Sequence, residues 1–348
     1  MRMASLWRVV LVAAALGLAA VPAAAENTVD RDRIGGVDRY DTAARMATHA
    51  FPDGASHVIL ARGDDYADSL AAAPLASAKN APVLLTGSTS LPTVTIDALE
   101  ALDADAVTVA GGPGAVDPEV ESALEAHGYE VVRLAGDDRY DTAAQLVERQ
   151  VAREQVGELW GETTALVASG EGFADALMGG WYAALGDPPL PLVLTGGDHL
   201  PAATVDALEA AGVERTIIIG GEAAVSVDVA DALEAEGFAV SRRAGDDRHG
   251  TAVQVADAAG RDFAHTSIEE IYLARDDHYA DAVAAAPAVA QLERVLLLSH
   301  PDAEPYRGIL ADRACHNPGV DRVTAVGGEE AVSPAELDAT AEMAGACR

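Results

Sequence analysis

The chain has 348 residues, half of them apolar, with 56 Asp and Glu against 23 Lys and Arg. This length and apolar content exclude a disordered chain and allow two or three domains, each with a core of its own. The formal net charge of −33 disfavours binding to nucleic acid or to an anionic lipid surface.

Residues 1–25 have the layout of a secretory signal. Arg2 and Arg8 precede an apolar run from Val9 to Val21, and a small-residue stretch ends at Ala25. A run of about 13 residues is short for a membrane span, so we expect cleavage near Ala25. The mature chain then carries 21 bases against 56 acids, a formal charge of −35, and we expect no membrane span in it.

From residue 31 onward, helix-like and strand-like patterns alternate. The pattern predicts helices at 41–51, 67–79, 92–102 and 117–128, and strands at 57–61, 82–86, 107–112 and 130–134. Continuously apolar strands that alternate with helices indicate a mostly parallel sheet covered on both faces. We therefore expect a small Rossmann-like α/β unit.

The same motifs then return in the same order, which is typical of an internal repeat. The phrase "RIGGVDRYDTA" at 33–43 returns as "RLAGDDRYDTA" at 133–143 and as "RRAGDDRHGTA" at 242–252. Three further motifs also have two later copies, roughly 100 to 110 residues apart: "YADSLAAAP" at 66–74, "PVLLTG" at 82–87 and "VTVAGGPGAV" at 107–116. The sequence predicts three tandem modules, at 31–133, 134–241 and 242–348.

The repeated phrase places an arginine before a helix in every copy: Arg39, Arg139 and Arg248. Two interpretations stay open. The arginine could pair with the aspartate that precedes it, or it could act as an anion clamp, because its planar fork and a helix N-terminus both favour phosphate or carboxylate groups.

The residues after this arginine differ between copies. Tyr40-Asp41 and Tyr140-Asp141 become His249-Gly250 in the third module. We expect Asp41 and Asp141 to cap the helices, with Thr251 taking over in the third copy. Further N-caps are expected at Asp117, Ser226 and Ser333, the last as a capping box with Glu336.

A second repeated polar position follows a strand in each module: Asp68, Asp175 and Asp281. Each is preceded by Ala and an aromatic residue: Tyr66, Phe173 and Tyr279. The carboxylate could simply favour the first helical turn. Alternatively, because α/β folds bind ligands at the carboxyl ends of their strands, the ring could stack on a sugar, and the acid could accept hydroxyl bonds or hold Ca²⁺.

The glycine pairs after the next strand, 111–112, 220–221 and 327–328, are best explained by tight strand-to-helix turns. No catalytic motif such as G-x-S-x-G, H-E-x-x-H or a P-loop occurs, and the histidines lack metal-ligand spacing. Cys315 and Cys347 are expected to form a disulfide in an oxidising compartment.

These ordered motifs, present three times, resemble the cell-wall-binding repeat family of the second type. The resemblance covers the chain from about Arg33 to its end, with no recognisable effector domain beside the modules. It implies an exported protein whose Rossmann- or Toprim-type α/β units form a pseudo-threefold group. It also implies non-covalent retention on the envelope through an anionic wall polysaccharide.

We therefore expect a secreted, non-enzymatic surface protein without a required cofactor, and Ca²⁺ bridging to the polymer stays open. The candidate polymer-binding residues are Arg33, Arg39, Tyr40, Asp68, Arg133, Arg139, Tyr140, Asp175, Arg242, Arg248 and Asp281. The six arginines come first, because a polyanion needs local positive charge on so acidic a chain. Two alternatives remain: a peptidoglycan hydrolase or a modulator of one, and a structural component of a surface array.

Overall fold

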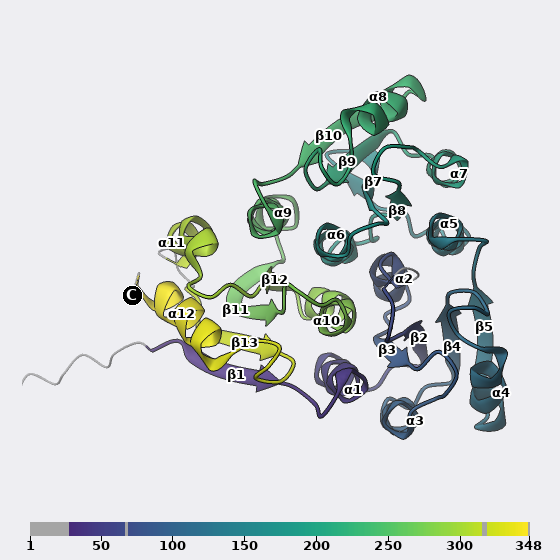
Figure 1. The fold of residues 1–348 in the computed structure, drawn as a ribbon, viewed down its shortest axis with the longest axis horizontal. Coiled ribbons are helices and arrows are strands. Elements are labelled where there is room, and N and C mark those ends of the chain that lie inside the picture. The colour runs from purple at the N-terminus through teal and green to yellow at the C-terminus, as the bar shows by residue number, and fades with distance from the viewer. Residues whose placement is uncertain (1–27, 67–68, 315–318, 347–348) are drawn as a thin grey trace, which may run out of the picture.

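The computed structural model describes residues 28–66, 69–314 and 319–346. It contains three α/β units grouped around a common centre (Figure 1). The expected signal, Asp68 and the cysteines Cys315 and Cys347 lie outside the described residues. Within those residues, none of the helices is both long and apolar enough to span a bilayer.

Each unit is built on a sheet in which four strands run parallel. The first has the order β3 (Val83–Thr86), β2 (His57–Arg62), β4 (Ala106–Ala110) and β5 (Glu130–Leu134). The second has the order β8 (Leu192–Thr195), β7 (Glu162–Ser169), β9 (Arg215–Ile219) and β10 (Ala239–Arg243). A short strand, β6 (Glu158–Leu159), pairs antiparallel with β7.

The third sheet joins the two ends of the chain. Its order is β12 (Arg294–Leu298), β11 (Ser267–Ala274), β13 (Arg322–Val326) and β1 (Asp30–Ile34). In the β1–β13 pair, Asp30 lies opposite Arg322 and Ile34 opposite Val326. The first two sheets lie almost entirely within the modules 31–133 and 134–241, whereas the sheet of the module 242–348 is completed by β1 from the start of the chain.

Helices of four kinds recur in the units. The repeated phrase leads into α1 (Arg39–Ala50), α5 (Arg139–Val151) and α9 (Arg248–Asp262). The central helices are α2 (Ala72–Ala78), α6 (Ala174–Ala184) and α10 (Ala280–Gln291). Outer helices are α3 (Thr93–Ala101), α7 (Ala202–Ala210) and α11 (Arg307–Ala314), the last after the 3-10 turn η1 (Glu304–Tyr306). The remaining helices are α4 (Pro118–Ala126), α8 (Val227–Ala235) and α12 (Pro334–Gly345).

The three central helices contact one another and form the middle of the molecule (Figure 1). They are rich in alanine, and the small side chains allow close helix approach. Apolar residues of all three units belong to one continuous core, which includes the fully buried Trp181 and Tyr182 of α6. The units therefore form one packed body.

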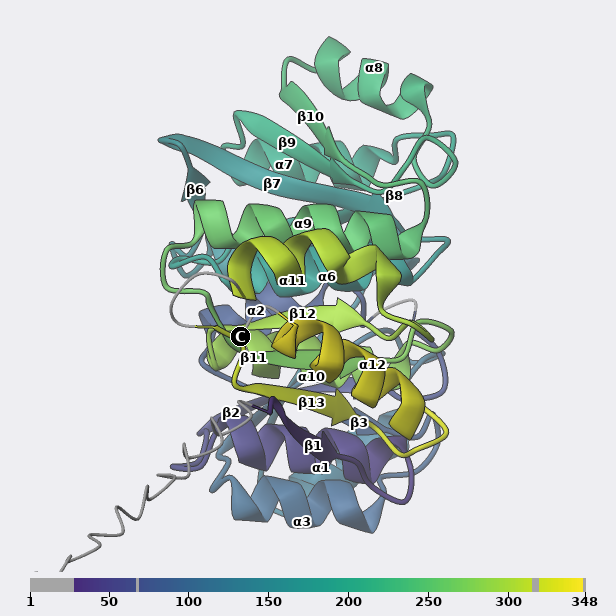
Figure 2. The ribbon, with the colours of Figure 1, turned by 90° about the vertical axis from the view of Figure 1, so that its left-hand side faces the viewer.

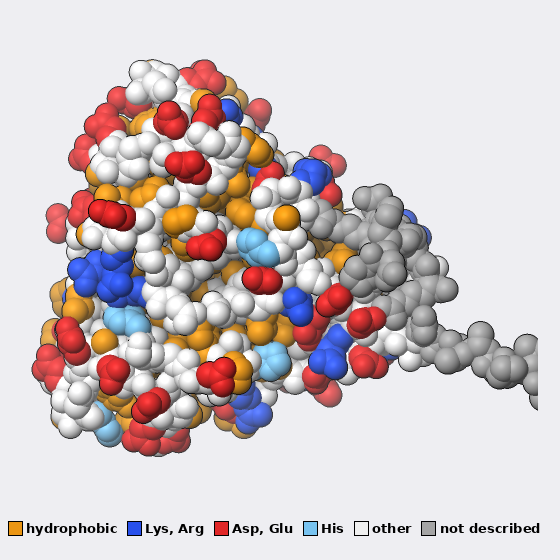
Figure 3. Space-filling view, turned by 180° about the vertical axis from the view of Figure 1, so that it is seen from behind, with side chains coloured by type: hydrophobic (Ala, Val, Ile, Leu, Met, Phe, Trp, Pro, Cys, Tyr) orange, Lys and Arg blue, Asp and Glu red, His pale blue; other side chains and the backbone are white. Residues whose placement is uncertain are grey.

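The carboxyl ends of the parallel strands and the N-termini of the following helices lie toward one side (Figure 2). This side, which faces the viewer in Figure 1, is the front face. Figure 3 shows the opposite face, over which acidic side chains are spread while basic ones gather at a few places. Ligands bind at the carboxyl ends of strands in folds of this class, so the front face holds the candidate site.

Candidate functional site

The repeated phrase links an edge strand of one sheet to the helix that packs on the next unit. The structure shows that the helices start one turn earlier than expected: Asp38, Asp138 and Asp247 are the N-caps, and each accepts backbone N–H bonds with its side chain. The prediction that Asp41, Asp141 and Thr251 are the caps is therefore wrong. Asp41 lies in the first turn, where it accepts from the Val37 N–H at 3.0 Å.

The first set of arginines, Arg33, Arg133 and Arg242, supports the glycine-pair loops. Arg33 donates to the carbonyl oxygens of Gly327 and Gly328, at 2.9 Å each, and to that of Val332 at 2.7 Å. Arg133 donates to the Gly111 carbonyl at 2.6 Å and pairs with Glu121 at 2.8 Å; Arg242 donates to the Gly220 carbonyl at 2.7 Å. These guanidinium groups are partly buried, and their bonds fix the loops in place.

The second set, Arg39, Arg139 and Arg248, lies at the helix N-termini of the front face. Each donates to a backbone carbonyl in the loop after a central strand, namely those of Gly63, Gly170 and Asp276. One interpretation from the sequence was an ion pair between each arginine and the preceding aspartate. In the structure the arginine bonds the loop carbonyl instead, because that aspartate caps the helix.

Three aromatic residues meet between these arginines. The ring centroids of Tyr66 and Tyr279 lie 5.3 Å apart, those of Tyr66 and Phe173 5.8 Å, and those of Phe173 and Tyr279 6.1 Å. The guanidinium of Arg139 lies 6.0 Å from the Tyr66 ring centroid, and that of Arg248 lies 6.0 Å from the Phe173 centroid. The rings therefore contact one another and join the three units, rather than standing apart as separate sugar platforms.

Asp175 and Asp281 lie in the first turns of α6 and α10 and are largely buried. Burial raises the pKa of both carboxyl groups; Thr251 and Arg248 partly offset this rise at Asp175, and Arg275 and Arg39 do so at Asp281. The Asp175 Oδ1 atom is buried and has no hydrogen-bond partner. Such an unpaired acceptor is unfavourable unless a ligand or water satisfies it.

The turns of two glycine pairs pack closely against the carboxylates of Asp175 and Asp281. Gly220 has φ +112° and Gly327 has φ +100°, and a Cβ on either would lie 2.5 or 2.6 Å from the nearest oxygen of Asp175 or Asp281. Both the backbone conformation and the space require glycine here. The prediction of tight strand-to-helix turns is confirmed.

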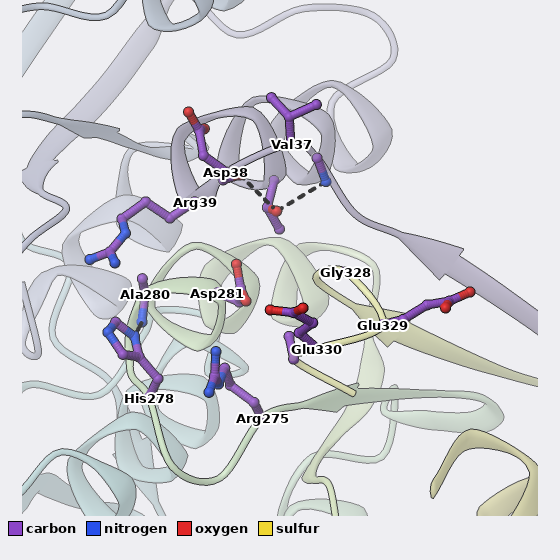
Figure 4. Close-up of a pocket in the computed structure, with 13 residues that line it drawn as sticks. Val37, Asp38, Arg39, Arg275, His278, Ala280, Asp281, Gly328, Glu329 and Glu330 are labelled. Carbon is purple, nitrogen blue, oxygen red and sulfur yellow. Dashed lines mark hydrogen bonds between the residues drawn. The ribbon is translucent and has the colours of Figure 1, made fainter. Parts of the chain in front are cut away.

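Two cavities open at equivalent places of the front face. One, of about 340 Å³, lies between the start of α1 and the loops after β11 and β13, and its lining includes Arg39, Arg275, His278, Asp281 and Glu330. In Figure 4, Arg275, Asp281 and Glu330 point into one space, while Glu329 points away. Sequence reasoning missed Arg275, His278 and Glu330, although they stand beside the repeated motifs.

The second cavity, of about 450 Å³, lies between the start of α9 and the loop after β7. Its lining includes Phe173, Asp175 and Arg248, together with Tyr66 and Glu171. Both cavities are lined by arginine side chains, which donate hydrogen bonds, and by carboxylates, which accept them. Such a lining suits a ligand with hydroxyl groups or with a single anionic group. No group of three or more His, Cys, Asp or Glu side chains suited to a metal ion occurs in the part of the chain that the structure describes.

Known proteins share this sequence pattern and this arrangement. A family model described as cell wall binding domain 2 (CWB2) matches residues 33–121, 133–230 and 242–336. In Bacillus subtilis (strain 168), the N-acetylmuramoyl-L-alanine amidase LytC is 30% identical over 281 residues, which cover 80% of this chain and 52% of that protein. The amidase enhancer of the same organism is 26% identical over 293 residues, covering 84% and 38%.

Solved structures agree with the fold. Cwp6 from Clostridium difficile superposes with a TM-score of 0.77 at 24% identity, over 90% of this chain and 48% of that one. Cwp8 from the same organism gives 0.74 at 27% identity, over 90% and 52%. This chain spans about half or less of the length of these relatives. The three matched repeats show that the chain belongs to the cell wall binding domain 2 family.

Proposed function

We propose that this chain is a secreted, non-enzymatic surface protein that attaches to the cell wall by binding an anionic polysaccharide through its three modules. Membership of the family supports wall binding. The observation that carries the proposal is the placement of Arg39, Arg139 and Arg248 at three helix N-termini around one aromatic cluster. Guanidinium groups and helix N-termini both favour anionic groups.

We assign two roles to the six arginines. Arg39, Arg139 and Arg248 contact the polymer, because a guanidinium has five N–H donors and only one of them is needed for the bond to the loop carbonyl. Arg33, Arg133 and Arg242 hold the glycine-pair loops that form the cavity walls. Tyr40 and Tyr140 lie against the same loop glycines, Gly63 and Gly170, as the contact arginines do. We assign to Asp68, Asp175 and Asp281 the role of accepting bonds from polymer hydroxyls.

The high negative charge of the chain opposes a polyanion, so the binding depends on local charge and on repetition. Three linked sites raise the overall affinity roughly 10²-fold or more over one site when all can engage together. Ca²⁺ that bridges front-face carboxylates to the polymer would add to this. Binding is therefore to be measured both with Ca²⁺ and with a chelator.

Sedimentation of the full chain with isolated cell walls tests the proposal. Walls that retain their anionic polymer are expected to pull down the protein, and walls stripped of polymer are not. The triple variant Arg39→Ala/Arg139→Ala/Arg248→Ala should lose at least tenfold in wall affinity. A matched control, Arg31→Ala/Arg45→Ala/Arg307→Ala, removes the same charge at exposed ion pairs. Unchanged sedimentation with stripped walls would contradict the proposal.

A second candidate is a modulator of a wall amidase, because the matched relatives include an amidase and an amidase enhancer. The zymogram of this chain alone on peptidoglycan is expected to show no clearing. Faster clearing by an added wall amidase would favour modulation.

A further inference from the structure

A β-hairpin in the second unit carries an unusual turn. It lies in the stretch 151–164, where the second repeat is longer than the other two, and a two-residue turn of Trp160 and Gly161 joins β6 to β7 (Figure 2). Both turn residues have positive φ, +56° for Trp160 and +81° for Gly161. Asn or Gly is the favoured first residue of such a turn, and a bulky residue in the left-handed region is a conformational outlier. Outliers of this kind cluster at functional sites.

The Trp160 side chain lies on the surface but is held in place. Trp160 is 62% exposed, whereas Trp181 is completely buried. The guanidinium of Arg215 lies 5.5 Å from the Trp160 ring centroid, and that of Arg243 lies 6.0 Å from it. Arg215 pairs with Glu162 at 2.5 Å, and Arg243 pairs with Asp262 at 2.9 Å, so both cations are fixed. The indole is therefore a positioned surface rather than a loose side chain.

A cavity of about 290 Å³ opens beside the indole, between the hairpin, the end of β10 and α9. Apart from two alanines, its lining consists of Trp160, Arg242, Arg243, Gln254, Arg261 and Asp262. This set offers one flat apolar surface with several hydrogen-bond donors and acceptors around it. The Nη1 atom of Arg243, behind this lining, is buried and has no hydrogen-bond partner.

The charges of this cavity favour hydroxyl groups over a strongly anionic group. Arg243 is paired with Asp262, and Arg261 is paired with Asp257. A pyranose ring has an apolar C–H face that can pack on an indole, and hydroxyl groups around its edge that can bond paired charges and amides. The size of the cavity suits one such ring.

We infer that Trp160 and this cavity form a subsite for one pyranose residue of a glycan chain. The site is absent from the other two repeats and separate from the front-face arginines. Its biological role rests on the proposed function, since the wall supplies the glycan. Its binding chemistry can be tested without the wall.

Tryptophan fluorescence of the full mature chain provides the test. Of the three tryptophans, Trp7 lies in the expected signal, and Trp181 is shielded from solvent. Titration with a soluble N-acetylglucosamine hexamer or a galacturonic acid hexamer should shift the emission of Trp160 in a saturable way. A response to both indicates ring recognition, and a response to one identifies the preferred sugar.

The variant Trp160→Asn separates binding from folding. Because Asn-Gly favours this turn, the variant should unfold at the same or a higher urea concentration than the wild type. Its affinity for the hexamer, measured by calorimetry, should fall at least tenfold, whereas Val227→Asn at another exposed apolar residue should leave it unchanged. Equal hexamer binding by Trp160→Asn and the wild type would overturn the inference, as would the absence of any hexamer response.

Two further outcomes distinguish this inference from the proposed function. The front-face triple arginine variant should bind the hexamer as the wild type does, even if it no longer sediments with walls. If wall sedimentation fails for the wild type while the hexamer binds, the wall proposal fails and the subsite stands. Emission that shifts with protein concentration alone would instead identify self-association through Trp160 and overturn the subsite.

Discussion

The first two repeats and the third build the same arginine contact from different neighbours. In the first repeat the Tyr40 ring lies so close to Gly63 that a Cβ there would be 2.7 Å from Tyr40 Cε1. In the second, a Cβ on Gly170 would be 2.8 Å from Tyr140 Cε1. Neither glycine has a positive φ, so glycine is required here by space and not by backbone conformation.

The third repeat changes both partners together. His249 stands in place of the tyrosine, and Asp276 in place of the glycine. The smaller imidazole leaves room for the aspartate, and His249 Nε2 lies 3.3 Å from its Oδ2 and 3.0 Å from the Ser299 carbonyl oxygen. The backbone carbonyl of Asp276 still accepts from Arg248. The third repeat is therefore a repacked version of the contact.

Combining the tyrosine of the second repeat with the aspartate of the third is expected to cause the largest change in the free energy of unfolding. Gly170→Asp with Tyr140 retained should lower the free energy of unfolding by about 2 kcal/mol, because the added Cβ overlaps a packed ring. The double variant Tyr140→His/Gly170→Asp, which copies the third repeat, should recover more than half of this loss. Urea unfolding of the wild type, Gly170→Asp, Tyr140→His and the double variant gives the coupling energy between the two positions.

Gly172→Asp is a matched control in the same loop, because a Cβ on Gly172 would have no heavy atom within 4 Å. It should change the free energy of unfolding by less than about 0.5 kcal/mol. A coupling energy near zero would show that the tyrosine-glycine and histidine-aspartate pairs arose independently.

Neutralising the two buried carboxylates is expected to change the free energy of unfolding by a smaller amount. Burial raises the pKa of Asp175 above its unfolded value, and Thr251 and Arg248 only partly oppose this. The protonated form therefore stabilises the fold at low pH, and this stability is lost as the pH rises through the folded pKa. Asp175→Asn should raise the free energy of unfolding at pH 7 by about 1 kcal/mol, and the gain should shrink toward pH 3.

Asp281→Asn should gain less at pH 7, because both Arg275 and Arg39 favour the charged form of Asp281. Asp206→Asn, on the exposed side of α7, serves as the control that should be neutral at both pH values. Urea unfolding curves at pH 7 and pH 3 provide the comparison. An equal or greater gain for Asp281→Asn would reverse the expected order of the two sites.

Local rules predicted most elements from the sequence, because the deciding interactions lie within a few residues. Asp117 and Ser226 cap their helices as expected, and Ser333 forms the capping box with Glu336. The cap of α1 was placed wrongly, because "DRYD" offers two aspartates three residues apart and only the extended backbone at Asp38 selects between them.

Long-range pairing and side-chain direction could not be predicted in this way. The strand 30–34 was not predicted, and nothing in it specifies β13, almost the whole chain away, as its partner. Repetition identified Arg33 and Arg39 equally, yet one bonds three carbonyls of the glycine-pair turn and the other lies at a helix N-terminus on the front face. Trp160 was missed because Trp-Gly is not a recognised turn signal.

Restoring the acidic residue of the first helical turn in the third repeat should give the smallest effect. Gly250 occupies the position of Asp141 and faces Gly245, so that a Cβ on Gly250 would lie only 3.0 Å from Gly245 Cα. Gly250→Asp should raise the free energy of unfolding by about 0.5 kcal/mol through a stiffer backbone and a charge at the helix N-terminus, less the cost of this close contact.

Gly250→Asn adds nearly the same atoms without the charge, so the difference between the two variants isolates the helix dipole. That difference should fall in high salt, because the charge is near the surface. Thermal unfolding at low and high salt measures it, and a loss of stability in both variants would mean that the third repeat keeps glycine for space.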